Sequence, residues 1–296
     1  MRPPEIPHLR LALHFRTRAP LRRPPLVGSA LRGLLWYALE ALARESVSPV
    51  ARGRILDLRA RFFRPRRPAE GGPLGRVDRI PPPWALGDVF VPRTRRLPAG
   101  HPLVAECVLV GGAMGERTLL VDAFALAPRF PFLGVPGALE LEAVTEPPPL
   151  PAPPPTPALA LRLSSPLRLR RGGREVGPER LDATTLAYAT VHRLALLAHF
   201  HAGMDRPVDV RAVLAAARRV RLRERELVWW DGHRASARQG RRVPVGGLLG
   251  RLVLDLRDCP GLAAFLAAAR PFGLGKGTTL GLGRFALAPA SAPAGA

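Results

Sequence analysis

Cysteine is scarce in this chain of 296 residues, and long apolar runs are missing from it. Its two cysteines, Cys107 and Cys259, are too few for a disulfide scaffold or for a zinc site built from cysteines. No stretch approaches the roughly 20 apolar residues that a membrane span requires. The first residues also contain no apolar signal core. We therefore expect a cytoplasmic protein that makes no contact with a membrane.

Acidic residues are also few, with 23 Asp and Glu against 45 Lys and Arg, which gives a net charge of +22. A GC-rich genome would favour arginine over lysine, but it does not explain the excess of basic over acidic residues. A surplus of this size attracts polyanions. We expect the partner to be a nucleic acid.

Lysine is the rarest basic residue type, because Lys276 is the single lysine of the chain. A compact ammonium group fits a tight backbone loop where the planar fork of a guanidinium group does not. Lysine at a position where this chain would otherwise use arginine therefore predicts a function for Lys276. The alternative is that one lysine survived by chance.

Proline divides the chain into two parts of similar length. Residues 146–157 hold proline at a density that neither a helix nor a sheet tolerates, which predicts an extended, semi-rigid linker. The linker separates a first domain, residues 1–145, from a second domain, residues 158–288. The small residues of the tail, 289–296, predict disorder.

The first domain begins with an alternating pattern. This pattern predicts a strand over residues 9–18, with one apolar face and one basic face that includes His14 and could meet a ligand. A helix is expected to open at Gly28 with Ser29 as its N-cap. Further elements are expected as a strand over 103–111, a helix over 118–127 and a strand over 138–144.

The second domain repeats this order of elements. Asp182 is expected to cap a long helix that reaches about Phe200. The other predicted elements are strands over 159–170, 221–230, 245–256 and 284–287, and helices over 207–220 and 260–269. Both halves thus predict a ferredoxin-like (RRM-like) split βαβ domain. The predicted fold class is α+β, with tandem ferredoxin-like domains joined by a Pro-rich linker.

The most informative motif is the glycine-rich segment of residues 272–285. Glycines on both sides of Lys276 let backbone N–H groups approach a phosphate without obstruction by a Cβ atom. The segment is not a Walker loop, because Arg270 replaces the first required glycine and Gly277 replaces the hydroxyl residue after the lysine. Phosphate contacts are predicted from Gly273, Gly275, Lys276, Gly277, Thr278, Gly281, Gly283 and Arg284.

Residues 275–284 of this motif resemble the C-terminal signature of the CRISPR-associated endoribonucleases that process repeat RNA. This family belongs to the RAMP superfamily of tandem ferredoxin-like proteins. Three further segments resemble parts of the same family. They are residues 28–33 at the first helix, residues 81–84 before a middle strand, and residues 230–239 with 246–250 in a hairpin of the second domain.

The resemblance implies a metal-independent nuclease that uses no cofactor. The family cuts precursor CRISPR RNA within each repeat by attack of a ribose 2′-OH on the adjacent phosphate. The products are a 2′,3′-cyclic phosphate and a 5′-OH, and the enzyme often retains the product stem. Such a reaction needs a base, an acid and positive charge on the phosphate. The implied partners are precursor CRISPR RNA and other CRISPR effector subunits, and a homodimer stays open.

Two other functions stay open. The first is a non-catalytic RAMP-type subunit that binds CRISPR RNA in an effector complex without cutting it. The second is a basic RNA-binding protein of ribosomal type.

The general base has several candidates. Many family members carry a histidine at about the place of Tyr37, and tyrosines position the 2′-OH in some relatives. His14 lies on the basic face of the first predicted strand, and its alternative role is that of a surface histidine. Tyr37 is alternatively a half-buried helix aromatic.

The long helix of the second domain offers further candidates. His192 and His199 are seven residues apart and share one helix face, which is alternatively only a polar face. His201 lies at the end of this helix, where it could instead interact with the helix dipole. A mechanism without histidine, in which Tyr37, Arg32 and Lys276 mainly orient the RNA, also stays open.

A basic loop of the second domain completes the predicted RNA-binding residues. It is expected to contact the phosphate backbone of an RNA stem, or alternatively to be a solvated hairpin tip. Its predicted RNA-binding residues are Arg234, Arg238, Arg241 and Arg242.

Overall fold

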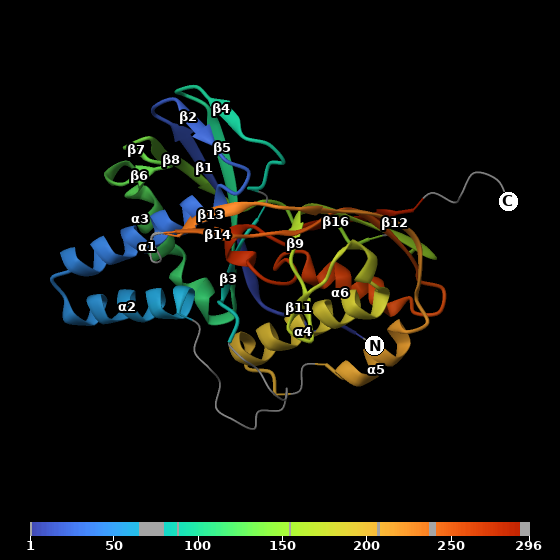
Figure 1. Cartoon of the computed structure of the whole chain (residues 1–296). Helices are drawn as coiled ribbons and strands as arrows, with labels where there is room; N and C mark the ends of the chain where they lie inside the picture. The colour runs from blue at the N-terminus through green and yellow to red at the C-terminus, as the bar shows by residue number, and fades with distance from the viewer. Residues whose placement is uncertain are drawn as a thin grey trace. The chain divides into compact units, whose positions relative to one another are not determined.

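The structure, a computed structural model, describes residues 2–64, 80–87, 89–153, 155–205, 208–236 and 241–290. The chain forms two compact units. The N-terminal unit consists of residues 7–148 with Thr279–Gly281, and the C-terminal unit consists of residues up to 6, residues 149–278 and those from 282 onward. Each unit has a four-stranded sheet of its own (Figure 1).

The N-terminal unit is built on the sheet β3-β5-β1-β8, in which all neighbouring strands are antiparallel. This order, with helices after the first and third strands, is that of a ferredoxin-like domain. Its principal elements are β1 (His8–Thr17), α1 (Gly28–Glu45), α2 (Pro49–Phe63), β3 (Trp84–Leu86), β5 (Pro102–Val110), α3 (Arg117–Ala125) and β8 (Leu139–Thr145). Short hairpins pair β2 (Leu21–Arg23) with β4 (Arg95–Leu97) and β6 (Pro131–Phe132) with β7 (Val135–Pro136).

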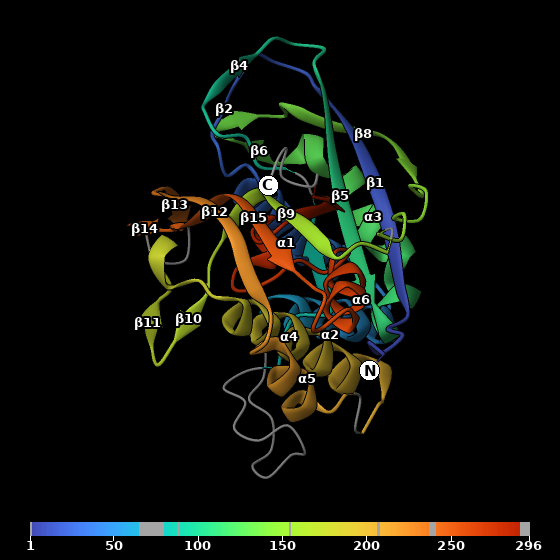
Figure 2. The same ribbon diagram turned by 90° about the vertical axis from the view of Figure 1, so that its right-hand side faces the viewer.

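The C-terminal unit has the same topology in its sheet β12-β15-β9-β16, so the prediction of two ferredoxin-like folds is confirmed. Figure 2 shows β15 between β12 and β9, and α4, α5 and α6 together on one side of this sheet. Its principal elements are β9 (Ala158–Leu167), α4 (Ala183–Ala202), α5 (Val210–Ala217), β12 (Arg221–Trp230), β15 (Gly247–Asp255), α6 (Gly261–Ala269) and β16 (Phe285–Pro289). Two short hairpins pair β10 (Arg170–Arg171) with β11 (Arg174–Glu175) and β13 (His233–Ser236) with β14 (Arg241–Pro244).

Along β1, buried apolar side chains alternate with polar side chains on the opposite face of the sheet, as the sequence predicts. Leu11, Leu13 and Phe15 are buried and pack with apolar side chains of α1, α2 and α3 in one core. The ring of Phe15 meets that of Phe124 from α3 edge to face, with 5.7 Å between the ring centroids. The helices therefore cover the face opposite to His14.

The basic face of β1 carries less free charge than its sequence predicts. Arg10 forms a two-pronged ion pair with Glu106 of β5, with N–O distances of 2.9 and 3.0 Å. Arg16 pairs with Glu142 and Arg18 with Glu140, both from β8. Neighbouring strands thus supply an acidic partner for each of these three arginines, and the expectation that this face meets a ligand stays a prediction.

The helix caps confirm one prediction and correct another. The Asp182 carboxylate accepts the N–H of Thr185 at 2.6 Å and caps α4, as predicted. Helix α1 begins at Gly28, so Ser29 lies within its first turn and makes no capping bond. The N-cap assigned to Ser29 is therefore wrong.

One helix and several boundaries also differ from the sequence prediction. Helix α2 was not predicted, although Ser48 caps it and Pro49 occupies its first turn. Helix α5 begins at Val210 with Asp209 as its cap, and Pro207 lies outside the described residues. Strand β16 extends through Pro289, one residue into the predicted tail, while residues 291–296 also lie outside the described part. In the described part of the chain, no helix is long and apolar enough to cross a membrane.

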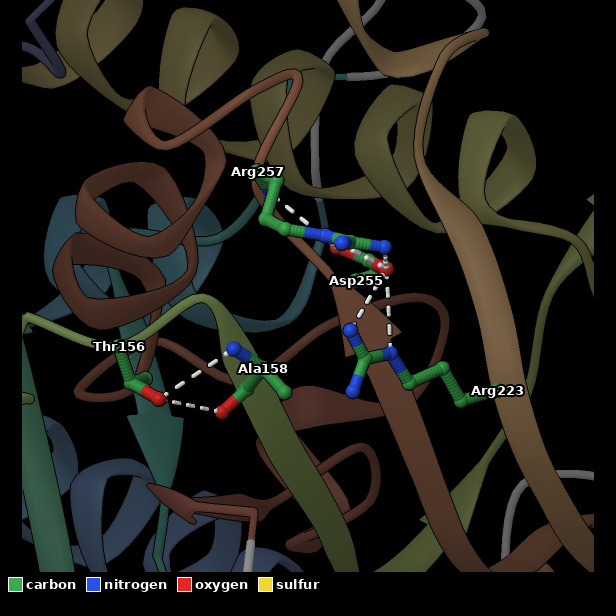
Figure 3. A network of polar contacts seen from close by, with 5 residues as sticks. All are labelled: Thr156, Ala158, Arg223, Asp255 and Arg257. Carbon is green, nitrogen blue, oxygen red and sulfur yellow. Dashed lines mark hydrogen bonds and ion pairs between the residues drawn. The ribbon is translucent and has the colours of Figure 1, made fainter. Parts of the chain in front are cut away.

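A carboxylate fixes the end of strand β15 (Figure 3). Asp255 is largely buried and accepts hydrogen bonds from Arg257 at 2.7 Å and from Arg223 of β12 at 2.8 Å. These two guanidinium groups hold the pKa of Asp255 well below its ordinary value of 3.8. At the start of the neighbouring strand, the Thr156 hydroxyl donates to the Ala158 carbonyl at 2.8 Å. The cluster thus links β12 to the end of β15. This end lies beside the start of β9, where Asp255 pairs with Ala158.

This carboxylate predicts a pH-dependent stability. Because the folded-state pKa is depressed, its stabilisation is complete above about pH 5 and is lost as the pH falls from about 4 through the lower folded value. We expect Asp255→Asn to have a lower free energy of unfolding than the wild type at pH 7. The difference should shrink towards pH 2, as measured by urea unfolding. Asp205→Asn, at an exposed carboxylate, is the control, and a difference that is constant with pH would contradict the assignment.

Candidate RNA interface

The glycine-rich loop lies between α6 and β16 and has a backbone that only glycine adopts readily. Gly273, Gly275, Gly277, Gly281 and Gly283 all have positive φ, between 67° and 84°. At two of these positions, a neighbouring backbone carbonyl also leaves no room for a side chain. A Cβ atom on Gly283 would lie 1.8 Å from the Leu274 carbonyl oxygen, and one on Gly275 would lie 2.3 Å from the Arg168 carbonyl oxygen. The glycines are therefore required by the shape of the loop itself.

Backbone hydrogen bonds attach this loop to the end of β9. The N–H of Lys276 donates to the Arg168 carbonyl at 2.9 Å, and that of Gly283 donates to the Pro166 carbonyl at 3.0 Å. Within the loop, the N–H of Leu274 donates to the Gly283 carbonyl at 2.9 Å. These N–H groups are occupied, so they are not available to cradle a phosphate in this conformation.

Other donors of the loop remain for a ligand. Among the described residues, no backbone carbonyl accepts from the N–H of Gly275 or from that of Gly277. Lys276 stands between them, and its side chain is exposed. An ammonium group flanked by two unbonded N–H groups suits a phosphate oxygen.

Two predicted contact residues have a different position in the structure. Thr278 is buried, with 4% of its surface exposed, and its hydroxyl lies 3.0 Å from a guanidinium nitrogen of Arg193. Arg284 is also buried and donates from Nη1 to the Pro271 carbonyl at 2.7 Å. Their surroundings favour support of the loop over direct contact with a ligand.

Arg193 was not among the residues predicted from sequence. It lies on the buried face of α4, between Val191 and Leu194, with 9% of its surface exposed. The only signal was an arginine in the apolar stripe of a helix, which does not reveal what the guanidinium contacts.

The candidate bases of the N-terminal unit lie on opposite sides of its sheet. The Nε2 atom of His14 lies 2.9 Å from the Thr145 hydroxyl on the outer face. Tyr37 lies on α1, which covers the other face; its side chain is 46% exposed, and its ring stacks near that of Phe130. His14 and Tyr37 therefore do not form one catalytic pair within this unit.

The candidate histidines of the C-terminal unit lie on α4. The Nδ1 atom of His199 lies 3.0 Å from the Met204 carbonyl oxygen, just past the helix end. His201 is partly exposed two residues further, and side chains two apart point to different sides of a helix. The ring of His192 stacks on that of Tyr188, and burial lowers the pKa of His192. These histidines therefore lie in separate surroundings along one helix.

The remaining predicted contacts are divided between α1 and the hairpin β13–β14. The guanidinium carbon of Arg32 lies 4.8 Å from the ring centre of Phe63 in a cation–π contact. Arg234 lies in β13, partly buried, and burial lowers its pKa. Arg238 and the side chains of Arg241 and Arg242 lie outside the described part of the chain. Within the described residues, no group of three or more His, Cys, Asp or Glu side chains could hold a metal ion.

The two units match known families in different ways. Residues 161–285 match the family model of the CRISPR-associated endoribonuclease Cas6, and residues 6–151 match a model described as an N-terminal domain. A comparison with curated proteins found no match.

Solved Cas6 structures share this fold over nearly the whole chain. A product complex of Cas6 from Thermus thermophilus aligns with a TM-score of 0.59 at 17% identity, covering 95% of this chain and 100% of that one. A second Cas6 product complex aligns with a TM-score of 0.53 at 21% identity, covering 95% and 98%. A partial Cas6-RT-Cas1–Cas2 complex aligns with a TM-score of 0.57 at 13% identity, covering 97% of this chain and 46% of that one.

The C-terminal part of the chain is thus similar to Cas6 over residues 161–285. The segment that matches Cas6 contains helix α4, helix α6 and the whole glycine-rich loop, including Lys276. The family resemblance read from residues 275–284 is thus confirmed.

Lys276 supplies a direct test of the loop. We expect Lys276→Ala to weaken RNA binding and to lower the slope of log affinity against log salt concentration by about 1, because one phosphate contact is lost. Its thermal stability should not change, since the side chain is exposed. Binding is measured by fluorescence anisotropy at several salt concentrations. Arg174→Ala, which removes an exposed charge of the same unit, is the control, and equal losses in both variants would contradict a specific contact.

Proposed function

We propose that this protein acts as a Cas6 endoribonuclease, which cuts precursor CRISPR RNA within its repeats, without a metal ion, and retains the product stem. The observation that carries the proposal is the loop around Lys276. It offers an exposed ammonium group and two N–H groups from which no described backbone carbonyl accepts, on a backbone that hydrogen bonds hold in place. A fixed set of donors of this kind stabilises developing negative charge on a phosphate.

The proposed reaction is an internal transesterification. The ribose 2′ oxygen loses its proton to a base and bonds to the adjacent phosphorus, while the bond from phosphorus to the 5′ oxygen breaks. The leaving 5′ oxygen takes a proton. The products are a 2′,3′-cyclic phosphate and a 5′-OH, and no step consumes water or a cofactor.

Four side chains remain proposed for the proton transfers or for placing the 2′-OH: His14, Tyr37, His199 and His201. His14 and His201 are the preferred bases, since an imidazole nitrogen can accept the proton of the 2′-OH. The contact between His14 and Thr145 would fix one imidazole nitrogen and leave the other for the RNA.

The proposed partner is the repeat RNA itself. Two of the Cas6 structures that share this fold are described as product complexes, and a third is described as a partial Cas6-RT-Cas1–Cas2 complex. By analogy, we propose that this chain binds its RNA product and works beside other CRISPR proteins in the cytoplasm. The charge of +22 supports an RNA partner.

A second candidate function is binding without cleavage, as in a RAMP subunit that only holds CRISPR RNA. It is favoured by the separation of His14 from Tyr37 on opposite sides of one sheet. It differs from the first proposal in chemistry but not in the surface that the RNA would contact.

Cleavage in the presence of EDTA tests the leading proposal. We expect the wild-type protein to cut its cognate repeat RNA once, and mass spectrometry to find a 2′,3′-cyclic phosphate on the upstream product. RNA with a 2′-deoxyribose immediately upstream of the cut is the control and should stay intact, because it lacks the nucleophile. Cleavage that depends on added magnesium would contradict the proposed mechanism. Tight binding without any cleavage would select the second function.

Single-turnover rates test the proposed base. Acid–base catalysis contributes about 10²–10⁴-fold to a rate, so the variant that removes the base should lose about that factor and keep its RNA affinity. The variants are His14→Ala, Tyr37→Phe, His199→Ala and His201→Ala, with His192→Ala as the control on the same helix as two of them. Rates close to wild type in all four would contradict a role for these groups and favour a mechanism without histidine.

A further inference from the structure

A buried arginine, Arg193, contacts the glycine-rich loop and has no acidic partner among the residues that the structure describes. Nη2 of Arg193 lies 3.0 Å from the Thr278 hydroxyl oxygen and 3.5 Å from the Phe272 carbonyl oxygen. Its Nε atom is buried and has no hydrogen-bond partner among the described residues. No carboxylate in the described part of the chain forms an ion pair with it. Buried guanidinium groups are normally paired with a carboxylate, so this arrangement needs an explanation.

The energetics of this arginine argue against a purely structural role. Burial lowers the pKa of Arg193 to about 10, which reflects the unfavourable removal of its charge from water. A long apolar side chain at this position of α4 would avoid that penalty, and replacing buried charges by apolar side chains is often neutral or stabilising. The geometry, however, gives Arg193 two contacts that an apolar side chain could not make.

Those two contacts lie on either side of Lys276. Phe272 precedes the first glycine of the loop, and Thr278 follows Gly277. A single guanidinium group thus reaches the backbone before Lys276 and the side chain after it. The Arg284 guanidinium adds a bond to the Pro271 carbonyl, one residue before Phe272. The base of the loop is therefore fixed by cations from α4 and from the start of β16.

We propose that Arg193 is a positioning residue for RNA binding, which holds the Phe272–Thr278 segment in the shape that presents Lys276 and the Gly275 and Gly277 N–H groups to a phosphate. This proposal rests on the proposed function of the loop. A bound phosphate also supplies the negative charge that Arg193 lacks, so RNA binding relieves part of the penalty of its burial.

The first test needs no RNA and examines the loop alone. We expect Arg193→Met to raise hydrogen exchange at the loop amides of Leu274 and Gly283, measured by mass spectrometry, while its melting temperature is not lower than that of the wild type. Thr278→Val, which removes the hydroxyl acceptor but keeps the shape, should raise the same exchange to a smaller extent. Leu186→Ala, two turns earlier on the buried face of α4, should lower the melting temperature without a selective effect on the loop. Unchanged loop exchange in both Arg193→Met and Thr278→Val would overturn the proposal.

The second test is a double-mutant cycle with repeat RNA whose 2′-OH groups are O-methylated, which blocks the nucleophile. We expect about a tenfold weaker affinity for Arg193→Met and a salt slope lower by about 1, as for Lys276→Ala. The double variant should lose little more than either single variant, because Arg193 acts through Lys276. Arg193→Lys should recover part of the affinity, since it keeps a charge near Thr278.

The outcomes separate the two proposals. Independent, multiplying losses in the double variant, or wild-type affinity in Arg193→Met, would overturn the positioning role. If the wild type itself fails to bind the RNA, the proposed function fails, while the exchange experiment still decides whether Arg193 orders the loop.

Discussion

The absence of Cβ atoms in the loop between α6 and β16 is the constraint on which the candidate site depends. Five glycines have left-handed backbone conformations there, and at Gly275 and Gly283 a neighbouring carbonyl oxygen occupies the place of a side chain. The same close approach lets the loop bond to the end of β9 through Pro166 and Arg168. A flexible segment rich in glycine is thereby fixed, and Lys276 is held exposed upon it.

The basic residues of this chain do not all have the same role, which the net charge alone does not reveal. On the outer face of β1, arginines are paired with glutamates from β5 and β8, and near the end of β15 two arginines share Asp255. These ion pairs link neighbouring strands. Arg193 differs because the described residues give it hydroxyl and carbonyl oxygens but no acid. The position of a charge relative to acidic side chains therefore decides its function.

Local patterns predicted most of the architecture. The alternation of Leu11, Leu13 and Phe15 placed β1, and Asp182 marked the start of α4, because these signals depend only on neighbouring residues. The Ser29 cap was wrong because a serine near a helix start does not reveal which residue has the extended backbone. Helix α2 was missed because its many arginines obscured the Ser48 and Pro49 signal.

The sequence by itself determined the ferredoxin-like folds and the resemblance of residues 275–284 to Cas6, because order, spacing and glycine content are local properties. Tertiary structure alone decided which donors remain for a ligand. The N–H groups of Lys276 and Gly283 donate to carbonyl groups that are distant in the sequence, so they are not available to a ligand. The side chains of Thr278 and Arg284 are buried. It also brought Arg193, about 80 residues earlier in the chain, beneath the loop. Contacts between residues so far apart follow from the packing of α4 on the sheet, which no local pattern contains.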